Sequence, residues 1–297
     1  MESVPRMEPI ADLRRKVQAP VRAYNDVAGL LVGDRASIHV TRLFIALGLS
    51  PTLATISMLV FGLVGSALVL GGDGWAVAGF ACLFVYYVLD CVDGEVARFR
   101  KAEKLVWGFY DFLFHLAVKT AFFVCLGVYA WRTTGSPWMF GFGLSALLSV
   151  LFLKFLLDVP LVLAARHVVE RGGESSDRFA REILAGATPA DLEAEADPPG
   201  EEERFEFRGF LPTLRAVLTN FDLASILFLV AGVLDLFMDP FPLWGVQVDL
   251  KVTLLAFYGL VLPVDFLDRL QSHLRERRFI TDARRLLRRA NRFRLPR

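Results

Sequence analysis

Residues 75–98 read WAVAGFACLFVYYVLDCVDGEVAR, an apolar stretch that ends in a short acidic motif. The part from 75 to 93 is about as long as the ~20 residues that a helix needs to cross the hydrocarbon core of a bilayer. Asp90 and Asp93 stand at its end, where a charged side chain is costly unless something compensates it. The stretch therefore predicts a membrane-spanning helix with a polar site at one end.

Other parts of the chain are equally apolar. Of the 297 residues, 55% are hydrophobic, and the mean hydropathy of +0.46 is too high for a typical soluble protein. The net charge is only +1, and nothing indicates a nucleic-acid partner. We therefore expect an all-α membrane protein with six transmembrane helices, over residues 51–70, 75–93, 107–131, 137–163, 212–238 and 249–268.

The basic residues predict how these helices are oriented. They cluster at 14–16, before the first predicted span, at 98–101, after the second, and in the Arg-rich tail from 275 to 297. Lys and Arg are enriched in cytoplasmic loops, and an even number of spans returns the chain to the side where it started. We expect an integral, multi-pass protein of the cell membrane, with both termini and the acidic motif in the cytoplasm.

The segments outside the predicted spans differ in composition. Residues 1–46 form a juxtamembrane amphipathic segment, broken by Pro20, which predicts one or two helices on the membrane surface or a solvated leader without a function of its own. The core domain covers 47–268 and includes an acidic cytoplasmic loop at 166–211. The basic tail, 269–297, predicts a surface helix attracted to anionic lipids. The three cysteines lie in apolar stretches, which favours packing roles over disulfides.

The acidic motif has the spacing of a metal site. On a helix, Asp90, Asp93, Gly94 and Ala97 share one face, so two carboxylates point into a space that the small residues leave open for a nucleotide. The third predicted span places Asp111, His115 and Lys119 on one stripe, at intervals of four residues.

Carboxylate oxygens suit Mg²⁺ or Mn²⁺ better than zinc, and paired cations are able to clamp a diphosphate. We therefore predict two divalent cations bound by Asp90, Asp93 and Asp111, with Lys119 as a possible contact to an acceptor or a phosphate.

These residues resemble the signature of the CDP-alcohol phosphotransferase family, D-x-x-D-G-x-x-A-R, then eight residues, then G-x-x-x-D-x-x-x-D. The positions that match are Asp90, Asp93, Gly94, Ala97, Arg98 and Asp111. The resemblance covers residues 45–120. It implies a transferase that moves a phosphoalcohol, commonly a phosphatidyl group, from a CDP-alcohol to an acceptor hydroxyl and releases CMP. It also implies a role in phospholipid biosynthesis, and a homodimer.

The resemblance assigns roles to two further residues, and the chain departs from it at two positions. Arg98 would bind the diphosphate, and Thr55, in a stretch similar to the family's P-N-x-x-T, would touch the nucleotide. The motif glycine is replaced by Trp107, and the last aspartate, the expected general base, is replaced by His115. Neutral imidazole is able to accept a proton at physiological pH, so we expect His115 to be the catalytic base.

Other functions remain compatible with the sequence. The missing fourth carboxylate also fits a catalytically silent family member that binds nucleotide or lipid. Acidic residues in spans also occur in transporters of divalent cations or solutes, although the acids here are concentrated in one region. A structural membrane protein with an incidental acidic patch is the remaining alternative. The sequence does not identify the donor or the acceptor alcohol.

Overall fold

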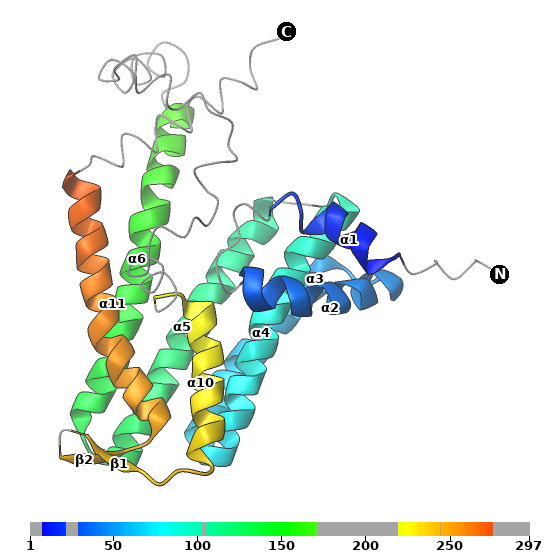
Figure 1. The fold of residues 1–297 in the computed structure, drawn as a ribbon. Helices are drawn as coiled ribbons and strands as arrows, with labels where there is room; N and C mark the ends of the chain where they lie inside the picture. Colours follow the sequence, from blue (N-terminus) through cyan, green and yellow to red (C-terminus); the bar gives the residue numbers. More distant parts are fainter. Residues whose placement is uncertain (1–7, 22–28, 103–104, 171–218, 244, 276–297) are drawn as a thin grey trace. The chain divides into compact units, whose positions relative to one another are not determined.

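The computed structural model describes residues 8–21, 29–102, 105–170, 219–243 and 245–275, with the backbone alone at 31, 105–107, 157–170 and 275. These residues are almost entirely helical (Figure 1). The elements are α1 (Ile10–Val17), η1 (Gly29–Gly33), α2 (Asp34–Ala46), α3 (Pro51–Leu68), η2 (Val69–Gly71), α4 (Asp73–Arg100), α5 (Leu105–Thr134), α6 (Pro137–Glu170), α10 (Phe221–Asp235), β1 (Phe241–Leu243), β2 (Val246–Val248) and α11 (Leu250–Arg275).

Helices of membrane-spanning length dominate this part of the chain. Five are long and apolar enough to cross a bilayer, and they cover Pro51–Gly71, Asp73–Arg100, Gly108–Thr134, Pro137–Leu156 and Leu250–Leu274. The predicted all-α membrane architecture is therefore confirmed at this level. The other predicted span, 212–238, contains α10, which has 15 residues, while 212–218 lie outside the described residues.

Several predicted boundaries differ from the structure. Helix α6 continues to Glu170, past the predicted start of the acidic loop at 166, because polar residues do not by themselves end a helix. The rest of that loop and most of the basic tail, 276–297, lie outside the described residues. The predicted loop 239–249 contains an antiparallel hairpin of β1 and β2, in which Gly245 has a positive φ.

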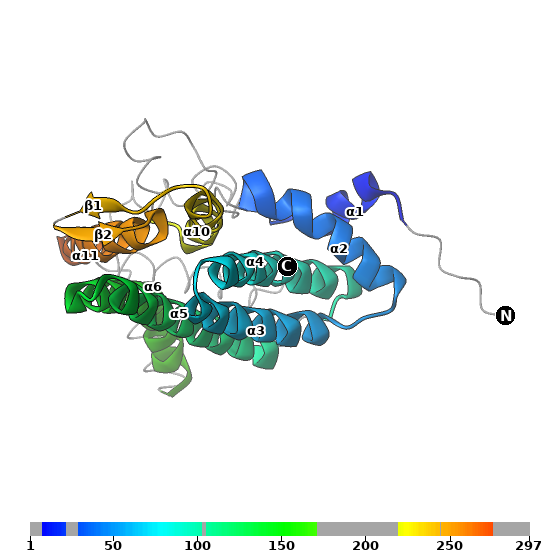
Figure 2. The same ribbon diagram turned by 90° about the horizontal axis from the view of Figure 1, so that it is seen from below.

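The described helices fall into two compact units. The first contains α1 to α5, the beginning of α6, α10, the hairpin and α11 up to residue 261. Within it, α4 packs against α1, α2, α3 and α10, and both views place α4 beside α3 (Figures 1 and 2). The second contains α6 from 148 and α11 from 262, where the rings of Phe152 and Phe266 are 5.9 Å apart.

The two sides of α4 are packed differently. Against α3 the backbones meet, since a Cβ added to Gly79 would lie 2.5 Å from the carbonyl oxygen of Gly65. Small residues permit such close approach between membrane helices. Towards α5 large side chains bridge the helices, for example Phe80 and Phe122, whose ring centroids are 6.4 Å apart. The wider spacing leaves room for polar side chains between α4 and α5.

The N-terminal segment folds onto one end of α4. Helix α1 ends at Val17, before the predicted break at Pro20, and α2 follows as a second helix. Leu13, Val17 and Ile38 form a buried cluster, against which Phe99 of α4 packs. The described part of this segment thus contains two α-helices, where one or two were expected, and their placement on a membrane surface stays a prediction.

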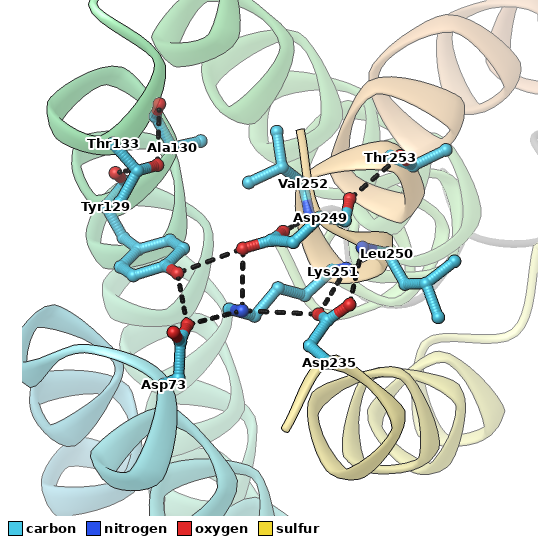
Figure 3. A network of polar contacts seen from close by, with 10 residues as sticks. All are labelled: Asp73, Tyr129, Ala130, Thr133, Asp235, Asp249, Leu250, Lys251, Val252 and Thr253. Atoms are coloured by element: carbon cyan, nitrogen blue, oxygen red, sulfur yellow. Dashed lines mark hydrogen bonds and ion pairs between the residues drawn. The ribbon is translucent and has the colours of Figure 1, made fainter. Parts of the chain in front are cut away.

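A network of charged residues around the buried Lys251 connects the helices at the other end of the first unit (Figure 3). The ammonium group of Lys251 lies 2.7 Å from Asp249, 2.8 Å from Asp73 and 3.2 Å from Asp235. The Tyr129 hydroxyl donates to Asp73 and Asp249. One lysine and one tyrosine thereby connect the beginnings of α4 and α11 with α5 and the end of α10. We call these five residues the distal network.

Candidate functional site

Asp90 and Asp93 lie in the last turns of α4, the helix that carries the distal network at its other end. Asp73 and Asp90 are 17 residues apart in α4. This corresponds to ~26 Å along an α-helix, close to the ~30 Å of a bilayer core. Helix α4 ends at Arg100, and the next residue, Lys101, has the left-handed conformation typical of a C-terminal cap. The charged residues of α4 are thus separated by an apolar stretch of membrane thickness.

Asp111 and His115 face Asp90 from the first turns of α5. The Nε2 atom of His115 is 3.0 Å from Oδ1 of Asp90 and 3.5 Å from Oδ1 of Asp111. One ligand atom from each of the three residues lies within 4.8 Å of the others. The side chains are partly exposed, at 20% for His115, 28% for Asp90 and 35% for Asp111. We call these three residues the acidic cluster.

The acidic cluster fits a divalent cation by donor chemistry and by spacing. Carboxylate oxygens suit Mg²⁺ and Mn²⁺, whereas an imidazole nitrogen is a more typical ligand of a transition metal such as Mn²⁺ than of Mg²⁺. Two ligand atoms at right angles, each ~2.1 Å from a small divalent ion, are ~3.0 Å apart. The separation between Asp90 and His115 matches this value. The same atoms are also able to form a direct hydrogen bond, so the geometry permits an ion without requiring one.

Tyr86 contacts the other side of the His115 ring. Its hydroxyl lies against Nδ1, and the two rings meet edge to face with centroids 5.7 Å apart. Tyr86 is almost fully buried, at 1% exposure. Ionised carboxylates only accept hydrogen bonds, so Nε2 carries a proton in this arrangement, while Nδ1 accepts from Tyr86 in a neutral ring and donates to it in an imidazolium. Both ring nitrogens are therefore engaged.

Asp93 lies outside the acidic cluster and has a contact of its own. We expected it to bind a cation together with Asp90 and Asp111, and this role stays a prediction. Its Oδ2 atom accepts a hydrogen bond of 2.9 Å from the Thr55 hydroxyl of α3, although its charge still interacts with both aspartates. Thr55 is buried, and its hydroxyl also lies 3.1 Å from the carbonyl oxygen of Pro51. It therefore orients a motif aspartate, and its predicted contact with a nucleotide stays untested.

Arg98 extends towards the N-terminal segment. Its Nε donates to the Val17 carbonyl at 2.7 Å, and this carbonyl belongs to the last turn of α1, where backbone acceptors lack helical partners. Gly94 makes room for the guanidinium, since a Cβ there would lie 3.1 Å from Nη1 of Arg98. Ala97, the other small motif residue, is half-buried.

Lys119 continues the stripe of Asp111 and His115, as its spacing predicts. Its Nζ lies 4.9 Å from the centre of the Phe221 ring of α10. A cation over an aromatic face is a favourable contact. The structure therefore explains Lys119 through packing with α10, and its predicted contact with an acceptor or a phosphate remains a prediction.

Two buried residues beside the motif were not predicted from the sequence. Tyr86 stands one helical turn before Asp90, so helical spacing would have placed it near His115. Glu95 lies inside the motif at 2% exposure, and its partners come from residues far away in sequence. No local signal predicts those partners.

No family model matches the chain, and no curated protein matches it. The resemblance to CDP-alcohol phosphotransferases therefore depends on the motif residues of α4 and α5, and it stays a prediction.

Proposed function

We propose that the chain is an integral membrane transferase that moves a phosphoalcohol group from a CDP-alcohol to an acceptor hydroxyl and releases CMP. The observation that carries this proposal is the acidic cluster, in which Asp90, Asp111 and His115 meet from two different helices. The spacing between the motif halves, on either side of the turn between α4 and α5, is the one that the CDP-alcohol phosphotransferase signature requires.

In this proposal the acidic cluster holds a Mg²⁺ or Mn²⁺ ion, and Asp93 supplies a carboxylate for a second one. A bound divalent cation supplies positive charge that offsets the charge of a diphosphate and of a departing phosphate. Arg98 binds the same diphosphate through its terminal guanidinium nitrogens, whose planar arrangement suits phosphate oxygens. Gly94 and Ala97 leave space for the nucleotide, and Thr55 holds Asp93 in place through its hydroxyl.

The transfer itself needs one bond to form and one to break. The acceptor oxygen bonds to the phosphorus distal to cytidine, the bond from this phosphorus to the CMP oxygen breaks, and the acceptor proton passes to a group of the protein. We expected His115 to accept this proton. Nε2 of His115 faces two carboxylates and Nδ1 faces Tyr86, so neither nitrogen is open to an acceptor alcohol. With a cation bound, the ring would carry its proton on Nδ1, donate it to the Tyr86 hydroxyl and present Nε2 as a ligand, which favours a ligand role over a direct base role. A carboxylate of the site would then take the proton.

The membrane location of the reaction is part of the proposal. We place the acidic cluster at the cytoplasmic face of the cell membrane, where basic residues adjoin the end of α4 and where cytidine nucleotides are made. Donors with lipid tails would reach the cluster from the surrounding bilayer. Phospholipid synthesis and a homodimeric state are expected from the family resemblance.

The test is CMP release by the purified protein in lipid nanodiscs. The substrates are a panel of CDP-alcohols with polyol or phosphate-bearing acceptors, in the presence of Mg²⁺, Mn²⁺ or EDTA. We expect CMP release that requires both the cation and an acceptor, and that is lost in Asp90→Asn. Cation-independent release, or release that survives Asp90→Asn, would contradict the proposal.

A catalytically silent CDP-alcohol binder is the second candidate. The observation that favours it is His115 itself, which brings an imidazole where the signature has a carboxylate, and whose two nitrogens are engaged. This candidate predicts cation-dependent binding of CDP without CMP release from any donor, and gain of turnover in His115→Asp. Equilibrium dialysis with CDP, run beside the release assay, separates the two candidates.

A further inference from the structure

Glu95 stands inside the motif, between residues assigned to the nucleotide site, yet it faces away from the acidic cluster. It is 2% exposed and is enclosed by the N-terminal segment. Its Oε1 accepts from the Gln18 amide at 2.7 Å and from the Ser37 hydroxyl at 2.6 Å, and its Oε2 accepts from the Thr41 hydroxyl at 2.6 Å. A buried carboxylate is thus satisfied by three donors that lie 54 to 77 residues away in sequence.

The same residues connect α1 and α2 with each other. The Gln18 amide, just after α1, donates to Glu95 and also to the carbonyl oxygen of Asp34, the first residue of α2. Ser37 and Thr41 lie on one face of α2, one turn apart. Glu95 therefore joins three helices at a single carboxylate, at the end of α4 where the motif lies.

Arg98 lies one turn after Glu95, and α1 contacts its guanidinium at the Nε atom. Its Nε donates to the Val17 carbonyl, the residue directly before Gln18. A guanidinium has five N–H donors, and this bond uses one of them. Among the described residues, Glu95 accepts hydrogen bonds only from neutral groups. Its negative charge attracts the Arg98 guanidinium, but the two groups do not form a direct ion pair. Arg98 is thereby positioned through α1 while its terminal nitrogens retain donors for an anion.

We propose that Glu95 is a positioning residue for anion binding, which clamps α1 and α2 onto α4 and so holds the Arg98 guanidinium where a diphosphate binds. This inference rests on the proposed function, because it deepens the role of the same site. The N-terminal segment is accordingly a part of the nucleotide site rather than a separate leader. Without the clamp, the Val17 carbonyl loses its fixed position and Arg98 loses its orientation.

The test measures CDP affinity by equilibrium dialysis and Mn²⁺ affinity by electron paramagnetic resonance on the full chain in nanodiscs. We expect Glu95→Ala to weaken CDP binding at least tenfold and to change Mn²⁺ affinity less than twofold. Glu95→Gln keeps the shape of the side chain, and the Thr41 hydroxyl is able to turn and accept from the new amide. Its CDP affinity should stay within threefold of that of the wild type.

A milder variant and a matched control distinguish loss of the Glu95 contacts from loss of the whole fold. The double variant Ser37→Ala with Thr41→Val removes two hydroxyls from the carboxylate and should weaken CDP binding at least threefold. Tyr129→Phe removes a hydroxyl that donates to carboxylates in the distal network, and its CDP affinity should equal that of the wild type. Hydrogen exchange of residues 10–17 should accelerate in the clamp variants and remain unchanged in Tyr129→Phe.

Each outcome has one meaning. If the wild type binds CDP and Glu95→Ala binds it equally well, the positioning role is refuted while the proposed function stands. If Glu95→Ala loses CDP and Mn²⁺ affinity in parallel, the residue supports the whole site, and positioning of Arg98 is refuted as well. If the wild type itself does not bind CDP with any cation, both the proposed function and this inference fall.

Discussion

Replacing Lys251 by Met tests the distal network. The Lys251 side chain is 1% exposed and its ammonium group contacts three carboxylates. Methionine keeps the length and apolar volume of the side chain but removes the positive charge. The carboxylates of Asp235, 3% exposed, and Asp249, 16% exposed, then face each other across a buried space without a cation.

The magnitude follows from the burial of each pair. Breaking a buried ion pair by removing one partner costs ~3–5 kcal/mol, because the remaining charge stays buried without compensation. The Asp73 side chain is 59% exposed, so water replaces much of its interaction with Lys251, and that pair adds at most ~1 kcal/mol. Asp235 also accepts from the backbone N–H groups of Leu250 and Lys251, which partly satisfies it. We expect Lys251→Met to lower the free energy of unfolding by about 3–5 kcal/mol.

The assay is reversible unfolding by SDS in mixed micelles, followed by far-UV circular dichroism. Lys16→Met is a matched control, because Lys16 also lies 2.7 Å from a carboxylate, that of Glu8, but is 54% exposed. Its effect should be at most ~1 kcal/mol. Adding Asp235→Asn to Lys251→Met should restore part of the loss. Equal effects of the two lysine substitutions would refute the argument that burial makes the distal network stabilising.

Three further predictions concern the acidic cluster and the helix packing. His115→Asp should bind Mn²⁺ more tightly than the wild type in paramagnetic resonance titrations, because a third carboxylate adds negative charge; unchanged affinity would remove residue 115 from the ligand set. Tyr86→Phe should weaken Mn²⁺ binding or CMP release by ~10–100-fold, as loss of a partner to a metal-binding histidine typically does; wild-type affinity and rate would mean that the hydroxyl does not orient the ring. Gly79→Ala should cost ~1–3 kcal/mol of unfolding free energy, because its Cβ would lie 2.5 Å from a backbone oxygen. Gly74→Ala, whose Cβ meets nothing within 4 Å, should change stability by less than ~0.5 kcal/mol, and equal effects would contradict close packing of α3 on α4.

The helices were largely predictable because their signal is local. An apolar run of ~20 residues has few alternatives to a membrane helix, and five such helices are present where the sequence predicts them. The predicted span 212–238 stays a prediction in its first part, because residues 212–218 lie outside the described residues. The hairpin of β1 and β2 was missed because its strands have only three residues each.

Part of the candidate site was predictable for the same reason. Helical spacing of four residues placed Asp111 and His115 on one stripe, and an acidic pair at the end of a span indicated that Asp90 has a partner. Spacing within one helix does not specify which neighbouring helix a side chain meets. The hydrogen bond that Asp93 accepts from the Thr55 hydroxyl of α3 was therefore not predicted, and its assignment to a cation stays a prediction.

The amino-acid sequence by itself determined which segments are apolar helices and which faces of α4 and α5 are polar, because both follow from composition and the helical repeat. Only the tertiary structure decided that Glu95 lies inside a cradle of Gln18, Ser37 and Thr41, and that Lys251 compensates three carboxylates. These contacts join residues far apart in the chain. Their energy depends on how deeply the groups are buried and on interatomic distances to within a few tenths of an ångström. No local sequence pattern encodes either quantity.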